Sequence, residues 1–178
     1  MTVLCFGDSN TYGYDPREYF GGCYTSPWPL LLAEKTGWNI LNHGENGREI
    51  PKIPIKFPKT DLLIIMLGTN DLLQGNSVET VAKRMESFLK SIGPEISSLL
   101  LVAPPPMKLG SWVSETSLTE ASKKLAQAYQ TLSRQLGVWF ADAGEWNLSL
   151  AFDGVHLTEE GHRALAEGLC NYLMKANL

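Results

Sequence analysis

Residues 3–10 read VLCFGDSN, an apolar run that stops abruptly at a Gly-Asp-Ser turn. The run predicts a buried β-strand. Ligands of open α/β sheets bind beyond the carboxyl ends of the strands, and the hydroxyl of Ser9 would lie at such an end. Because Gly-Asp-Ser is also ordinary turn chemistry, Ser9 becomes a candidate nucleophile only in combination with residues elsewhere in the chain.

Four more apolar runs of strand length follow, at residues 38–42, 61–67, 99–103 and 138–141, and helical patterns separate them. The run at 61–67 has no alternation, which is typical of a strand covered on both faces. Strands that alternate with helices form right-handed crossovers and a parallel sheet. The sequence therefore predicts an α/β protein: a flavodoxin-like three-layer sandwich with a five-stranded parallel sheet and helices on both faces. Residues 1–178 are expected to form a single domain.

Capping residues mark the expected helix boundaries. A Ser-Pro pair at 26–27 predicts the start of the first helix, which should end near Gly37. Ser117 with Glu120 three residues later predicts a capping box at the start of a later helix. Thr158 is expected to cap the last helix.

Composition limits the classes of partner. The net charge is −4 and the pI about 5.4, and Lys and Arg residues are scattered along the chain. This charge disfavours binding to nucleic acid or to anionic membranes. No apolar stretch approaches the ~20 residues that span a bilayer, and the first residues lack the pattern of a signal peptide. We therefore expect a cytoplasmic protein with no membrane or nucleic-acid partner.

The sequence does not indicate a metal or cofactor site. Cys5, Cys23 and Cys170 lack the spacing of metal ligands. His156 and His162 are spaced so that they would not share one helical face. We expect neither a metal ion nor an organic cofactor.

The far end of the chain supplies the partners that a serine nucleophile needs. Asp153 and His156 lie three residues apart, just ahead of the last predicted helix. A serine hydroxyl attacks an acyl group efficiently only when a base takes its proton and a third group orients that base. We therefore expect Ser9, His156 and Asp153 to meet as nucleophile, base and orienting acid.

Three groups are candidate donors to the oxyanion of a tetrahedral intermediate. They are the amide of Ser9, the amide of Gly47 in the loop after the second strand, and the carboxamide of Asn70 after the third strand. Asp71 differs from these, because Gln74 three residues later predicts a helix cap and a structural role.

These motifs resemble those of the GDSL esterase/lipase family, the SGNH hydrolases. Within that family, the stretches at 5–9, 63–71 and 103–106 are most similar to the bacterial arylesterase and acyltransferase branch. The first motif is GDSN at 7–10, in which Asn10 stands where that family most often has Leu. Asn42 leading to Gly47, GTND at 68–71 and DGVH at 153–156 follow in the family's order. The resemblance spans nearly the whole chain, and it implies one SGNH-hydrolase-like domain.

The same resemblance implies roles for individual residues. Ser9 would be the nucleophile, with His156 as base and Asp153 as its acid partner. Ser9, Gly47 and Asn70 would form the oxyanion hole. Gly44 is the alternative to Gly47, although the usual five-residue step from the Asn favours Gly47.

Three functions are compatible with these residues. The first is a cofactor-free serine hydrolase that cleaves short-chain or aryl acyl esters through an acyl-enzyme on Ser9. The second is an acyltransferase or transesterase with the same triad, in which an alcohol replaces water. The third is a non-catalytic flavodoxin-like module that binds FMN, although the loop after the first strand lacks a Ser/Thr-rich phosphate cradle. The expected partner is a small-molecule ester, and the oligomeric state is left open, with a homo-oligomer among the alternatives.

Overall fold

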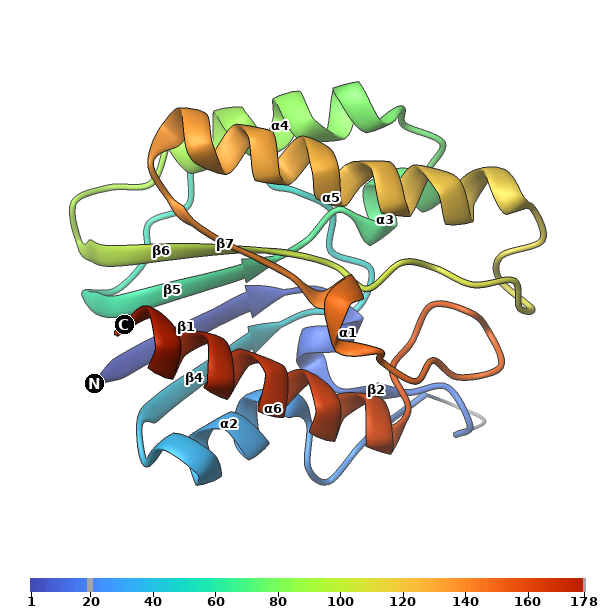
Figure 1. Ribbon diagram of the computed structural model, residues 1–178, viewed down its shortest axis with the longest axis horizontal. Coiled ribbons are helices and arrows are strands. Elements are labelled where there is room, and N and C mark those ends of the chain that lie inside the picture. Colours follow the sequence, from blue (N-terminus) through green and yellow to red (C-terminus); the bar gives the residue numbers. More distant parts are fainter. Residues whose placement is uncertain (19–20, 178) are drawn as a thin grey trace.

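The computed structural model describes residues 1–18 and 21–177 and contains the predicted parallel sheet (Figure 1). Its strands are β1 (Thr2–Gly7), β4 (Asn39–Gly44), β5 (Thr60–Met66), β6 (Ile96–Ala103) and β7 (Trp139–Asp142). They pair in parallel in the order β4-β1-β5-β6-β7. β1 thus lies inside the sheet, between β4 and β5, which follow it along the chain as the second and third strands of this sheet. This is the flavodoxin-like order. The predicted α/β sandwich is confirmed.

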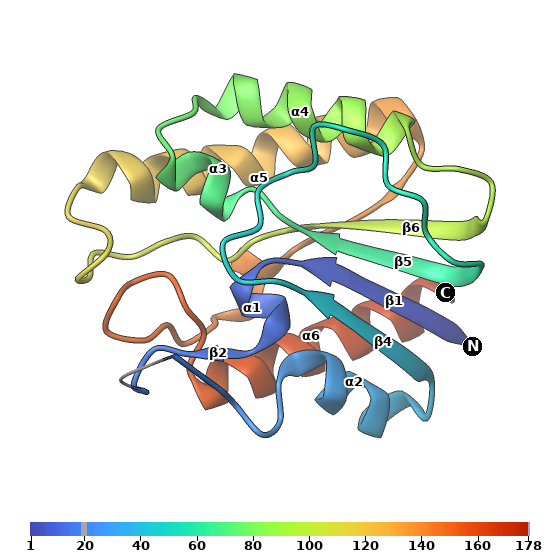
Figure 2. The same ribbon diagram turned by 180° about the vertical axis from the view of Figure 1, so that it is seen from behind.

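Helices cover both faces of the sheet. α2 (Trp28–Thr36) and α6 (Glu159–Ala176) lie on one face, while α4 (Val78–Lys90) and α5 (Thr116–Leu136) lie on the other (Figures 1 and 2). In β5, Leu63 and Ile65 belong to the core under α4 and α5, whereas Leu62 and Ile64 belong to the core under α2 and α6. Burial on both faces explains the absence of alternation in this strand. Each such side chain contributes about 1.5–3 kcal/mol when it leaves water.

Short elements connect these layers. They are α1 (Ser9–Tyr12), α3 (Thr69–Leu73), a hairpin of β2 (Tyr14–Asp15) and β3 (Gly22–Cys23), and the 3-10 helix η1 (Ala143–Trp146). None was predicted, because pieces of two to five residues are too short to show a periodic pattern. Among the described residues, no helix combines the length and the apolar character needed to cross a membrane.

The predicted helix caps are correct in part. Thr158 caps α6 by accepting a hydrogen bond from Gly161 N–H, and Gly37 ends α2 in the left-handed conformation at φ 70°. The predicted start of α2 is wrong by one position. α2 has Pro27 rather than Ser26 as its N-cap residue, and its first amide, that of Trp28, donates instead to His162 Nδ1.

The start of α5 also differs from the prediction. The helix begins at Thr116 with Glu115 as its N-cap residue, so Ser117 lies within the first turn. The Ser117 hydroxyl donates to the Glu115 carboxylate, which removes it from any cap. A capping box therefore does not form, although its sequence pattern is present.

Candidate active site

The carboxyl ends of β1, β4 and β5 meet at one edge of the sheet, and the segment after β7 reaches the same edge (Figures 1 and 2). β1 ends at Gly7, where a Cβ would lie 2.8 Å from Met66 O and closer still to Thr11. Only glycine allows α1 to start so close to the sheet. Asp8 then accepts a hydrogen bond from Asn10 N–H at 3.0 Å, so that Ser9 becomes the first residue of α1.

Ser9, His156 and Asp153 form a chain of hydrogen bonds at this edge. The Ser9 Oγ to His156 Nε2 distance is 3.0 Å, and the His156 Nδ1 to Asp153 Oδ2 distance is 2.6 Å. All three residues are buried, with Asp153 completely so. The two ends of the chain thus meet in the way the sequence predicts.

The protonation of this chain follows from its electrostatics. Burial acts to raise the pKa of Asp153, but hydrogen bonds from the His156 ring and from the amides of His156 and Val155 outweigh it, and the pKa lies below its usual value. Asp153 is therefore an acceptor only, so His156 Nδ1 must carry the proton of that hydrogen bond. The lone pair of Nε2 then faces the Ser9 hydroxyl, which is the tautomer that a general base requires.

The candidate oxyanion donors lie in the neighbouring loops. In the described part of the chain, no recorded hydrogen bond uses the N–H of Ser9 or of Gly47. Gly47 has φ 74°, a conformation that favours glycine, and a Cβ there would have no heavy atom within 4 Å. Asn70 donates one N–H of its carboxamide to Arg48 O at 3.1 Å, which leaves the second N–H for another acceptor.

Gly44 differs from Gly47 in both respects. Its N–H donates to Asn42 Oδ1 at 2.9 Å. A Cβ at Gly44 would lie 2.0 Å from the amide nitrogen of Tyr12. Gly44 is thus a position of close contact between β4 and α1, and its amide already has a partner.

Arg48 ties these loops together. Its guanidinium donates to Gly7 O at 2.9 Å and to His43 O, and it lies over the ring of Phe6. Its own carbonyl holds Asn70. Sequence reasoning did not identify Arg48, and no local pattern distinguishes it from a solvent-exposed arginine.

Asp71 has a structural role, but it is not the predicted helix cap. It lies inside α3, whose N-cap residue is Gly68. Its carboxylate accepts from Ile50 N–H at 3.0 Å and pairs with Arg84 at 3.0 Å. Burial raises the pKa of Asp71, and these two partners partly oppose the shift. The cap fails because the side chain points away from its own helix to the segment after Gly47.

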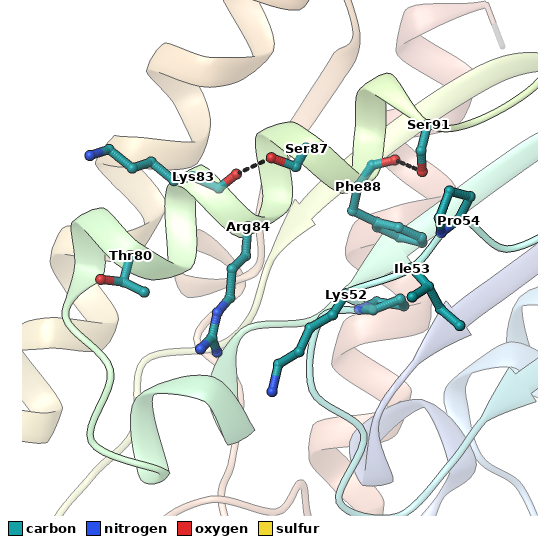
Figure 3. Close-up of a pocket in the computed structure, with 10 residues that line it drawn as sticks. Lys52, Ile53, Pro54, Thr80, Lys83, Arg84, Ser87, Phe88 and Ser91 are labelled. Carbon is teal, nitrogen blue, oxygen red and sulfur yellow. Dashed lines mark hydrogen bonds between the residues drawn. The ribbon is translucent and has the colours of Figure 1, made fainter.

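Arg84 also lines a groove of about 430 Å³ between α4 and residues 51–54. Figure 3 shows Lys52 and Arg84 beside this groove and Phe88 next to Pro54. The groove is lined by residues of α4, by Ser91 directly after it and by the 51–54 segment, and none of the predicted site residues is among them. The groove is therefore separate from the hydrogen-bonded chain of Ser9, His156 and Asp153.

Aromatic rings surround the imidazole of His156. The ring centroids of Tyr14 and Trp112 lie 4.6 and 5.0 Å from that of His156. Trp112 is 55% exposed and Phe152, beside Asp153, is 63% exposed. The exposed ring of Trp112, which contacts His156, is suited to contact a bound ligand. Trp146, by contrast, packs against Gly168 of α6.

His162 does not join the site. It is completely buried between α6 and α2, where it accepts the hydrogen bond from Trp28 N–H and lies against the ring of Tyr24. No group of three His, Cys, Asp or Glu side chains within residues 1–18 and 21–177 is arranged to hold a metal ion.

Comparisons with known proteins place this geometry in a family. Residues 5–164 match the model of the GDSL-like lipase/acylhydrolase family. A carbohydrate acetylesterase family member from Sinorhizobium meliloti has a TM-score of 0.83 and 26% identity over 99% of each chain. An aryl esterase from M. smegmatis has a TM-score of 0.84 and 24% identity over 98% of each chain.

A member of the lipolytic protein G-D-S-L family from Veillonella parvula has a TM-score of 0.78 and 20% identity over 98% of this chain and 99% of that one. The comparison with curated proteins gives no match. The family model covers most of the chain, and the folds agree over nearly its full length. This chain therefore belongs to the GDSL-like lipase/acylhydrolase family and is a carboxylic ester hydrolase.

Proposed function

We propose that this protein hydrolyses short-chain or aryl acyl esters through an acyl-enzyme on Ser9. One observation carries the proposal: Ser9 Oγ lies 3.0 Å from His156 Nε2, and His156 Nδ1 lies 2.6 Å from Asp153 Oδ2. A buried serine with a correctly oriented base has the arrangement needed for acyl transfer.

In the proposed reaction Ser9 Oγ attacks the ester carbonyl while His156 Nε2 takes the hydroxyl proton. The imidazolium is stabilised by the Asp153 carboxylate and returns the proton to the leaving alkoxide, which departs as an alcohol. A water molecule then gives a proton to Nε2 and attacks the acyl group. The free acid leaves and Ser9 regains its proton.

The oxyanion of each tetrahedral intermediate would accept hydrogen bonds from Ser9 N–H, Gly47 N–H and the second N–H of Asn70. Gly47 is favoured over Gly44 because the Gly44 amide already donates to Asn42. Asn70 is suited to the role because the Arg48 carbonyl can only accept a hydrogen bond. Asn70 therefore turns its Nδ2, rather than its Oδ1, toward the loop that carries Arg48. Removing one such donor typically costs about 10²–10³ in kcat.

The surroundings of His156 support small acyl groups on aromatic or sugar alcohols. Trp112 presents an exposed ring beside His156, and a flat apolar surface of this kind stacks on aryl groups and on sugar faces. The structural relatives described as an aryl esterase and as a carbohydrate acetylesterase family member agree with this substrate class.

The test is hydrolysis of p-nitrophenyl esters from acetate to decanoate. We expect the highest kcat/KM for the shortest acyl chains, and a loss of roughly 10⁴-fold or more in Ser9→Ala and in His156→Ala, because members of a catalytic unit fail together. Ser133→Ala is the matched control, since Ser133 is also buried but donates to Gln130 O within α5. Retention of activity in Ser9→Ala would remove Ser9 as the nucleophile. An added alcohol separates hydrolysis, which yields only acid, from acyl transfer, which yields a new ester.

A further inference from the structure

The segment that carries Asp153 and His156 has no regular secondary structure, so its position depends on individual contacts. Asn10, the residue after Ser9, is only 2% exposed and makes two of them with its carboxamide. Its Nδ2 donates to Val155 O at 3.1 Å, and its Oδ1 accepts from Leu157 N–H at 2.8 Å. The two partners are the backbone groups on either side of His156.

A primary amide is the side chain that suits this position. The Val155 carbonyl can only accept and the Leu157 amide can only donate, so the side chain must offer one donor and one acceptor. Leu offers neither, and a carboxylate offers no donor. The backbone of Asn10 is fixed as well, because its N–H donates to Asp8. Ser9 and the peptide groups around His156 are therefore linked through one residue anchored at both ends.

The backbone hydrogen bonds of His156 do not replace this link. Its N–H donates to Asp153 Oδ1, and its carbonyl accepts from Ala151 N–H at 2.7 Å, and both partners belong to the same irregular segment. Those bonds shape the segment, but they do not fix its distance from α1. Among the described residues, three hydrogen bonds join this segment to α1. Two are those of the Asn10 side chain, and the third is the bond between Ser9 and His156 itself.

We propose that Asn10 is a positioning residue that holds His156 within reach of Ser9. The inference rests on the proposed roles of Ser9 and His156. It predicts that a change at Asn10 acts on the chemical step more than on substrate binding, since a displacement of about 1 Å costs about 10²-fold in rate.

The test compares Asn10→Leu with Thr36→Val. Both replacements keep the approximate size and remove one donor and one acceptor. Thr36 Oγ1 donates to Leu32 O and accepts from Trp38 N–H at the opposite edge of the sheet. For Asn10→Leu we expect a 10- to 100-fold lower kcat, a KM within about twofold of wild type, and slower inactivation by a serine-directed fluorophosphonate. For Thr36→Val we expect a lower melting temperature with unchanged kcat.

Asn10→Ala covers the case in which Asn10→Leu does not fold, because the smaller side chain leaves room for water to pair with Val155 O and Leu157 N–H. Its kcat should also fall. A wild-type kcat in folded Asn10→Leu or Asn10→Ala would overturn the positioning role, as would a loss of kcat that Thr36→Val reproduces at equal melting temperature. If wild-type protein is not labelled at Ser9 by the fluorophosphonate, the proposed function fails instead, whatever the Asn10 variants do.

Discussion

Asp8 shows how a residue beside Ser9, the proposed nucleophile, can cost stability. Its side chain is 2% exposed, and burial raises its pKa to about 6, against the opposing effects of the Asn10 amide, His156 and Arg48. The folded protein therefore binds a proton at Asp8 more strongly than the unfolded chain does between pH of about 4 and about 6. Stability contributed by protonated Asp8 is lost as the pH rises through this window.

Asp8→Asn should remove this pH-dependent cost. Asparagine can still accept from Asn10 N–H, but it carries no charge to bury. We expect the variant to gain stability over wild type as the pH rises from about 4 to about 6, reaching at most about 3 kcal/mol above that range. Urea unfolding at several pH values measures the difference. A gain that does not change with pH would mean that the Asp8 charge is not its source.

His162 should have the opposite pH dependence. Burial, with a smaller effect of His156 and against that of Asp15, lowers its pKa from 6.5 to about 4. The unfolded chain then binds more protons than the folded protein between these pH values, so stability falls as the pH drops from about 6.5 to about 4. His162→Asn keeps an acceptor for Trp28 N–H but does not titrate. The variant should lack this part of the acid destabilisation in urea unfolding, and an unchanged acid profile would contradict the assignment.

At the scale of single residues, the sequence predicted which three residues meet better than it predicted the contacts that support them. Ser9, Asp153 and His156 could be named because acyl transfer demands those residue types and their motifs are local. Arg48, and the contact of Asn10 with the far end of the chain, could not be predicted. Their partners are backbone groups up to 147 residues distant, and a backbone group is the same whichever residue carries it, so no sequence pattern indicates such a contact.

At the scale of elements, the segment after β6 holds the segment that carries Asp153. Lys108 N–H donates to Gly154 O, Ser111 N–H to Phe152 O, and Trp112 N–H to Asp153 O, at 2.9–3.1 Å. The two backbones are so close that a Cβ at Gly110 would lie 2.4 Å from the carbonyl carbon of Asp153. Asp153 is thus fixed from one side by this segment, and His156 from the other side by α1.

Gly110→Ala should push these segments apart. We expect kcat for p-nitrophenyl acetate to fall about 10- to 100-fold, because the carboxylate that orients His156 is displaced. Gly137→Ala is the control: Gly137 has φ 68°, so alanine is strained there, but its Cβ would meet no atom within 4 Å. That variant should lose about 1 kcal/mol of stability, measured as a lower melting temperature, and should keep a normal kcat. Equal kcat in both variants would show that the close contact at Gly110 does not control Asp153.

The prediction of elements succeeded where the signal was local. Runs such as 61–67 gave the strands because burial on both faces requires continuous apolar residues. The caps at Ser117 and Asp71 were wrong because those side chains found partners outside the predicted cap, Glu115 in one case and Ile50 with Arg84 in the other. A capping pattern shows that a bond is available but does not exclude a competing one.

At the scale of the whole molecule, the active site joins the two ends of the chain. The start of β1 and the end of α6 lie close together at the edge of the sheet opposite the site (Figures 1 and 2). Ser9 follows β1 and His156 precedes α6, so both residues lie one element away from a terminus. Once the sheet has formed, the contact between Ser9 and His156 does not depend on the order in which the intervening elements are connected.

A circular permutant tests this arrangement. A flexible linker of about six residues joins the old termini, and the new ends lie between Gly93 and Pro94, in the exposed turn between α4 and β6. We expect cooperative unfolding and a kcat within a few-fold of wild type, because no contact of Ser9, His156 or Asp153 crosses that turn. A second permutant, opened between Gly110 and Ser111, keeps the sheet but frees the segment that holds Asp153. It should fold and lose most of its activity. If the first permutant folds but is inactive while the second is active, the site depends on continuity through the α4–β6 turn rather than on the segment that contacts Asp153.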